Sequence, residues 1–357
     1  MGSVLEPVRT ALEAPELHIG LLRGLVAAFA AGVLALVAVG LRSLLGRRWL
    51  RRLRLTASSR RLPGLVGPAF VVASVLALEA LQRSLIPAVR VAGTVPDLPT
   101  SVVLGLGLVW LGVAVAGLTP APLPVGMLLA LPGAWRLVAG QEFLGPSWVP
   151  WLIVLGTAVA GPLAAEADRD LGRTGLSPVM WLFVVGAAYA TVPDTELALV
   201  LLGVAIPLAL LGLPFRLARL GDGGAAASIG LLLWVASQQG WARPGSLIGT
   251  LGALALFTTF PIGHRLRRWF RFELHWSRNR RLLVVLLAQF VLAMWASRVA
   301  GLAYGAIEAI ARLIPAVAAG IALGIAMPMG RRRVPRSGRS SRRVRTEPSI
   351  GSTRTPA

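Results

Sequence analysis

Long apolar runs, separated by short segments rich in arginine, are the feature of this sequence that most limits its fold. Several runs approach or exceed the roughly 18 residues that a membrane-spanning helix needs. Only 14% of the 357 residues are charged, against about 25% in a soluble domain. A spanning β-barrel would instead show alternating segments of about 10 residues. The sequence therefore predicts an all-α fold, a polytopic integral membrane helical bundle.

We predict eleven spans in this bundle, with tight hairpin turns after the third and the sixth. Broken helices are frequent in transporters, and four of the spans contain an internal proline: Pro132, Pro162, Pro207 and Pro315. The segment "GIALG" (320–324) holds two glycines four residues apart, a pattern that favours close helix packing or dimerisation. The predicted spans cover 21–41, 64–85, 101–118, 122–140, 149–165, 177–192, 197–214, 224–240, 246–263, 282–299 and 304–327.

Arginine is distributed unevenly between the two predicted sides of the membrane. With eleven spans, the segments 42–61, 264–281 and 328–357 fall on the same side, and they hold eight, seven and nine Arg. Because basic loops stay in the cytoplasm, we expect the N-terminus outside and the C-terminus in the cytoplasm. This divides the chain into an extracytoplasmic segment (1–20), a transmembrane bundle (21–327) and a disordered basic cytoplasmic tail (328–357).

Composition excludes several chemistries. The chain has no cysteine, so disulfides, iron–sulfur clusters and thiolate metal sites are impossible. All 36 basic residues are arginine, which excludes a Walker A lysine and Schiff-base catalysis. The net charge of +21 is concentrated beside apolar runs, so anionic lipid headgroups, rather than nucleic acid, are the expected partner. This composition favours a multi-pass protein of a bacterial inner (plasma) membrane, and no cofactor is expected.

Charged residues near the outer ends of the spans are the candidate substrate-binding or proton-relay site. Glu308 and Arg312 are spaced i, i+4, so they share one helix face and can pair. Charge at this depth is costly unless it is paired or hydrated, so the group indicates a polar vestibule that opens outward. A neutralised structural pair is the alternative. The candidates are Arg23, Glu79, Arg136, Asp194, Glu196, Glu308 and Arg312.

Two further segments fall on the predicted cytoplasmic side. The basic, aromatic segment 264–281 is a candidate surface for lipid headgroups, and it is equally consistent with a simple topology anchor. "AEADRDLGR" (165–173) offers three carboxylates, but we expect a solvated loop rather than a Mg²⁺ site. "GDGG" (221–224) is expected to form a tight turn, because no strand precedes it as a phosphate loop requires. The candidate headgroup residues are Arg265, Arg267, Arg268 and Arg271.

Three functions fit these features. The first is a transporter or flippase-like protein for a lipid-linked or anionic amphiphilic substrate. The second is a non-catalytic membrane subunit of a cell-envelope assembly, which would have envelope-protein partners. The third is an integral membrane transferase that uses a lipid-linked donor. We expect no enzymatic activity from the first two, and the short outer loops count against the third, because such enzymes often carry larger outer segments.

Overall fold

The computed structural model describes a helical protein in which the described residues form no strand. One isolated bridge, between Gly64 and Arg219, is the only strand-like pairing among them. The predicted tail 328–357 lies outside the described part of the chain. The described residues are 15–52, 64–82, 98–141, 147–171, 175–190, 196–213, 215–238, 245–270, 278–302 and 306–327.

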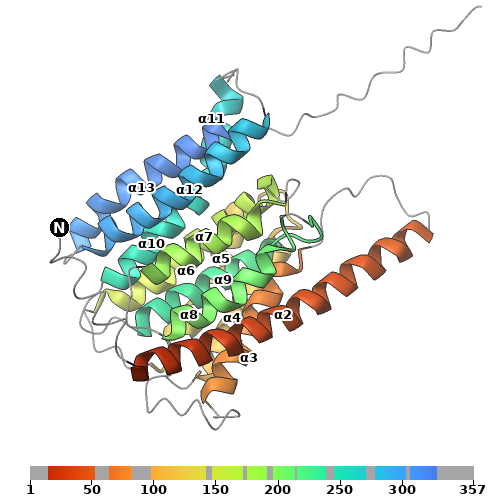
Figure 1. Ribbon diagram of the computed structural model, residues 1–357. Coiled ribbons are helices and arrows are strands. Elements are labelled where there is room, and N and C mark those ends of the chain that lie inside the picture. Colours follow the sequence, from red (N-terminus) through yellow and green to blue (C-terminus); the bar gives the residue numbers. More distant parts are fainter. Residues whose placement is uncertain are drawn as a thin grey trace, which may run out of the picture.

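The helices lie side by side with their axes roughly aligned (Figure 1). Neighbours along the chain pack as hairpins, such as α4 with α5, and distant segments also pair, such as α2 with α8 and α6 with α9. The elements are α2 (Pro15–Arg52), α3 (Val66–Gln82), α4 (Thr100–Ala116), α5 (Pro122–Val138), α6 (Val149–Leu171), α7 (Ser177–Ala190), α8 (Glu196–Ala209), α9 (Asp222–Gln238), α10 (Gly245–Thr258), α11 (Phe260–Phe270), α12 (Arg278–Gly301) and α13 (Ala306–Ala326).

Each predicted span coincides with a helix of the described chain, when α10 and α11 are counted as two parts of one. These two helices are separated at Thr259, because the ring of Pro261 prevents a regular hydrogen bond to the carbonyl four residues earlier. Elsewhere the helices α5, α6 and α13 continue through their internal prolines. Helix α8 ends at Ala209, two residues after Pro207 and earlier than predicted.

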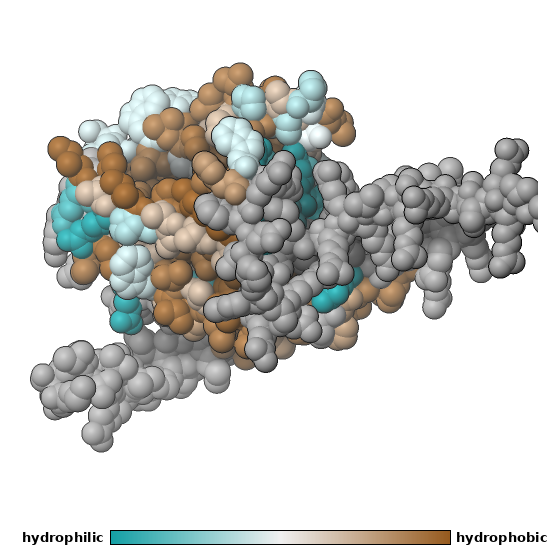
Figure 2. All heavy atoms as spheres, turned by 90° about the horizontal axis from the view of Figure 1, so that it is seen from above, coloured by the Kyte–Doolittle hydropathy of each residue, from teal (hydrophilic) through white to brown (hydrophobic). Residues whose placement is uncertain are grey.

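Within the described part of the chain, four helical stretches are long and apolar enough to cross a membrane, and the second of them runs from α10 into α11. They are Val149–Leu171, Leu247–Arg267, Leu282–Gly301 and Ile307–Ala326. The surface is apolar too, and brown hydrophobic residues cover much of the described face in Figure 2. Large side chains such as Leu283 on α12 and Ile314 on α13 are each 63% exposed. Exposed apolar area on this scale marks a membrane or interaction surface rather than a soluble exterior.

The interior is closed by aromatic contacts and by glycines. Trp181 of α7 packs edge-on against Phe70 of α3 and Phe257 of α10, with ring centroids 5.7 and 6.3 Å apart. On α13, Gly320 faces Leu256, and a Cβ added to Gly320 would lie only 2.9 Å from the Leu256 Cα. The "GIALG" glycines therefore serve close packing inside the chain, between α13 and α10–α11.

Candidate functional site

Glu308 and Arg312 form the ion pair that their i, i+4 spacing predicted. Both lie near the start of α13, and their side chains are 39% and 31% exposed. Arg312 also donates from Nη1 to the carbonyl of Val299 on α12, at 3.1 Å. The pair therefore joins the ends of α12 and α13, and it remains accessible from outside the bundle.

The other predicted vestibule residues are not gathered around this pair. Glu79 is half-buried on α3, and Arg136 is exposed in the last turn of α5. Neither helix packs closely against α13 or against the other. Arg23 lies on α2 and Glu196 begins α8, but their side chains are not described, and Asp194 lies outside the described residues. A vestibule built from all of them therefore stays a prediction.

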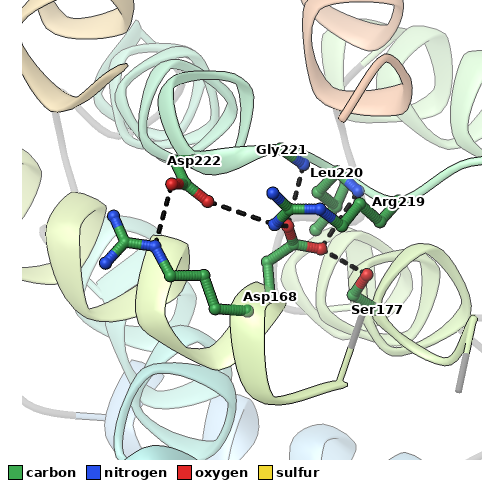
Figure 3. A network of polar contacts seen from close by, with 7 residues as sticks. Asp168, Ser177, Arg219, Leu220, Gly221 and Asp222 are labelled. Atoms are coloured by element: carbon green, nitrogen blue, oxygen red, sulfur yellow. Dashed lines mark hydrogen bonds and ion pairs between the residues drawn. The ribbon is translucent and has the colours of Figure 1, made fainter. Parts of the chain in front are cut away.

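The opposite end of the bundle holds a buried charge cluster that the sequence did not predict (Figure 3). The Asp168 side chain is fully buried near the end of α6. One of its oxygens accepts from Ser177 Oγ and, at 3.1 Å, from the Leu220 N–H. The other accepts from Arg219 Nη1 and, at 2.9 Å, from the Gly221 N–H. Four donors satisfy the carboxylate, so it is held as a structural anion.

Asp222, the first residue of α9, extends the cluster toward the protein surface. It accepts from Arg219 at 3.1 Å and from Arg169 Nε at 2.8 Å, and its side chain is 20% exposed. A carboxylate in the first turn of a helix is favoured by the helix dipole. Burial by itself lowers the pKa of Arg219, but Asp168 and Asp222 raise it more. The pKa of Arg219 therefore lies above its ordinary value, and the guanidinium stays charged.

The backbone around the cluster is equally constrained. Val66 and Gly67 at the start of α3 donate to the carbonyls of Arg219 and Leu220, at 3.0 and 2.9 Å. Gly221 has a φ of +86°, and a Cβ there would lie 2.8 Å from the Cα of Gly64. Only glycine combines this left-handed conformation with so close an approach. The prediction of a tight turn at 221–224 is wrong beyond Gly221, because Asp222–Gly224 form the first turn of α9. The N–H groups of Leu220 and Gly221, just before α9, hold Asp168.

A second row of polar contacts links α6 to α11. Asp170 contacts His264 Nδ1 at 3.0 Å, and Glu166 pairs with Arg265. The prediction that 165–173 forms a solvated loop is wrong up to Leu171, because these carboxylates lie on α6 and find partners on α11 and in the segment just before α9. Among the described residues, no group of three or more His, Asp or Glu is placed to hold a metal ion.

The predicted headgroup residues have different environments. Arg265 is paired with Glu166, yet its side chain remains 59% exposed. Arg267 is buried and donates to the carbonyl of Met327 at the end of α13. The side chain of Arg268 is not described, and Arg271 lies outside the described residues. Of the four, Arg265 is the one that the structure shows at the surface.

An apolar groove opens between α3 and α4, above a floor formed by α9. Its cavity volume is about 410 Å³. Helices α3 and α4 each pack against α9 but not closely against one another, which leaves the space between them. No ionisable side chain lines it: the lining is formed by Pro68, Val71, Val72, Val75, Leu76, Val103, Leu106, Gly107, Trp110 and Ala227.

No protein-family model matches the chain, and no curated protein matches its sequence. Two of the described charge groups differ in character. The buried cluster around Asp168 has its carboxylate oxygens occupied by internal donors, whereas the Glu308–Arg312 pair is partly exposed.

Proposed function

We propose that the chain is a multi-pass protein of a bacterial inner membrane that acts as a transporter or flippase-like protein. Its substrate would be lipid-linked or an anionic amphiphile, admitted through a polar vestibule on the extracytoplasmic face. The observation that carries the proposal is the half-exposed Glu308–Arg312 pair at the start of a helix long enough to span. Ionisable groups in such segments commonly mark substrate or proton pathways.

In this scheme Arg312 attracts the anionic group of the substrate, and Glu308 exchanges a proton as the pair opens. The bond from Arg312 to the Val299 carbonyl holds the guanidinium in place between α12 and α13. Arg136 is exposed on another helix and would widen the positive field at the vestibule mouth. Arg265, which is exposed on α11, would contact anionic headgroups on the cytoplasmic side.

The test is transport by the purified protein in vesicles of phosphatidylglycerol and phosphatidylcholine. The probe is a fluorescent phosphatidylglycerol in the inner leaflet, and its arrival outside is measured by quenching with an impermeant reductant. If Glu308 relays protons, Glu308→Gln lowers the rate about tenfold or more, about 1.4 kcal/mol in barrier height. Glu79→Gln tests the second candidate relay.

The matched control is Glu166→Gln, which removes a carboxylate of the same kind at the opposite end of the bundle. It should leave the rate within about twofold of the unmodified protein. All variants are first checked for a monodisperse elution profile and an unchanged unfolding temperature. Full transport by both Glu308→Gln and Glu79→Gln would reject the relay mechanism.

A second candidate is a non-catalytic subunit of an envelope assembly, and one observation favours it. Both carboxylate oxygens of Asp168 accept hydrogen bonds from donors within the chain, as expected of a rigid scaffold. This candidate predicts that deletion of 328–357 releases a co-purifying envelope protein. It also predicts that vesicles containing the intact chain move the fluorescent probe no faster than empty vesicles. A membrane transferase remains a third alternative, without a described residue that favours it.

A further inference from the structure

We propose that the groove between α3 and α4 binds one acyl chain of a phospholipid, with the phosphate directed toward the end of the bundle that holds the Asp168 cluster. This inference goes beyond the transport proposal and does not depend on it. It rests on the chemistry, the position and the dimensions of the groove.

The chemistry of the groove suits a hydrocarbon chain. Its lining offers no charged side chain, and its cavity of about 410 Å³ is within the range of small-molecule sites. Its rim is formed by side chains that are largely exposed, among them Val72 at 57% and Leu76 at 61%. An opening lined by exposed apolar side chains faces the lipid hydrocarbon when the bundle is in a membrane. An acyl chain therefore enters the groove laterally, from the bilayer.

The dimensions of the groove match one leaflet. On α3 the lining extends from Pro68 to Leu76, which at 1.5 Å per residue is about 12 Å. Half of a hydrocarbon core of about 30 Å is about 15 Å. The groove therefore accommodates most of the depth of one acyl chain and ends within a single leaflet.

The position of the groove indicates which way the bound acyl chain points. Pro68 is in the first turn of α3, directly after Val66, which hydrogen-bonds to the Arg219 carbonyl. The end of the groove at Pro68 is thus the end of the bundle where Arg169, Arg216 and Arg219 lie. Arg169 and Arg219 are paired there with Asp222 and Asp168, whereas the side chain of Arg216 is exposed. The guanidinium of Arg216 therefore favours the phosphate of a lipid at that end.

The walls argue against a partner helix as the occupant. Helices that dock in membranes meet at small residues, which let their backbones approach. Here only Gly107 and Ala227 are small, whereas both walls are dominated by valine and leucine, and Trp110 adds an indole. Such side chains would keep the backbone of a docking helix away from the walls of the groove. The space between the walls suits a flexible acyl chain better.

The experiment uses the full chain in vesicles that contain phosphatidylglycerol with a photoactivatable diazirine in the middle of one acyl chain. After illumination, labelled peptides are identified by mass spectrometry. We expect strong labelling of α3 and α4 around Val72 and Gly107. Gly107→Trp fills the groove, since a Cβ on Gly107 meets nothing within 4 Å. It should lower this labelling about tenfold, or about 1.4 kcal/mol.

Gly40→Trp is the matched control, because Gly40 on α2 also has open space beside its Cβ. It should leave the labelling of α3 and α4 unchanged. Equal labelling of these helices in both variants, or labelling no stronger than on the exposed faces of α12 and α13, would overturn the proposal. A disulfide-linked dimer formed by Gly107→Cys would overturn it as well, because a second copy would then cover the groove. A matching probe in phosphatidylcholine tests the headgroup: equal labelling by both lipids would overturn a selective role of the basic end.

Discussion

At the scale of single residues, the Asp168 cluster and the Glu308–Arg312 pair differ in what offsets the free-energy cost of removing a charge from water. A carboxylate away from water needs a counter-charge and enough donors to satisfy its oxygens. Asp168 obtains both, from Arg219, the Ser177 hydroxyl and two backbone N–H groups. Glu308 retains partial contact with solvent and pairs locally with Arg312. Asp168 is thus suited to hold structure, and Glu308 to change its partner.

Replacing Asp168 with Asn should strongly destabilise the protein. The amide NH₂ cannot accept the hydrogen bonds that one carboxylate oxygen accepts, and Arg219 loses its most buried counter-charge. Breaking a buried pair of this kind costs about 3 to 5 kcal/mol. Asp170→Asn is the control, because its pair with His264 is partly exposed and contributes about 1 kcal/mol or less. Unfolding in mild detergent, followed by circular dichroism, measures both. Equal losses would contradict the structural role of Asp168.

The sequence reveals one of these groups and not the other, for a physical reason. Glu308 and Arg312 are four residues apart, so helix geometry alone places them together. Asp168 and Arg219 are 51 residues apart, and their meeting depends on how α6 and α9 pack. The one available signal was that a carboxylate-rich segment and an Arg-containing segment fall on the same predicted side. That signal is compatible with a solvated loop as well.

At the scale of helices, hydrophobic length identified the elements, and packing determined their ends. The predicted span 149–165 stops where charges begin, yet α6 continues to Leu171 because its last turns are paired with α9 and α11. Helix α2 extends to Arg52, beyond the predicted end at residue 41. Apolar runs therefore give the number of helices, whereas contacts between distant segments decide how far each one continues.

Close helix packing leads to a prediction at Gly324. A Cβ at this position on α13 would lie 3.0 Å from the Gly263 Cα on α11, so Gly324→Ala must push the two helices apart. Overpacking of this kind costs about 1 to 3 kcal/mol. Gly107→Ala is the control, because its Cβ would meet open space and alanine favours a helix over glycine by about 0.5 to 1 kcal/mol. Unfolding temperatures in the same detergent should therefore shift in opposite directions. A shift in the same direction would show that α11 and α13 are not packed as described.

At the scale of the whole molecule, the two ends of the bundle are chemically distinct. One end gathers the Asp168 cluster and the pairs with α11, and the other presents the Glu308–Arg312 pair. Basic residues follow this division on α11, where Arg265 pairs with Glu166 near the Asp168 end. The positive-inside rule therefore predicts that the Asp168 end is the cytoplasmic one. The vestibule and the leaflet assigned to the groove both depend on this orientation.

Labelling of single cysteines tests the orientation directly, because the native chain contains none. Leu118 and Ile307 form a matched pair: each is an aliphatic residue with 87% exposure. Leu118 follows Gly117, which lies beside Arg169 and Asp222, whereas Ile307 precedes Glu308 at the other end. With an impermeant thiol reagent on intact cells, Ile307→Cys should react and Leu118→Cys should react only after permeabilisation.

The reverse pattern would place the N-terminus inside and the Glu308–Arg312 pair at the cytoplasmic face. A transporter would then receive its substrate from the cytoplasm at that pair, and the groove would lie in the outer leaflet. Reaction of both cysteines without permeabilisation would contradict a spanning bundle altogether. Glu308→Cys and Arg312→Cys extend the test inward by about 1.5 to 8 Å along α13 from Ile307. If both variants react from outside, as Ile307→Cys does, water reaches the Glu308–Arg312 pair. A vestibule requires this access to water, whereas a dry structural pair does not allow it.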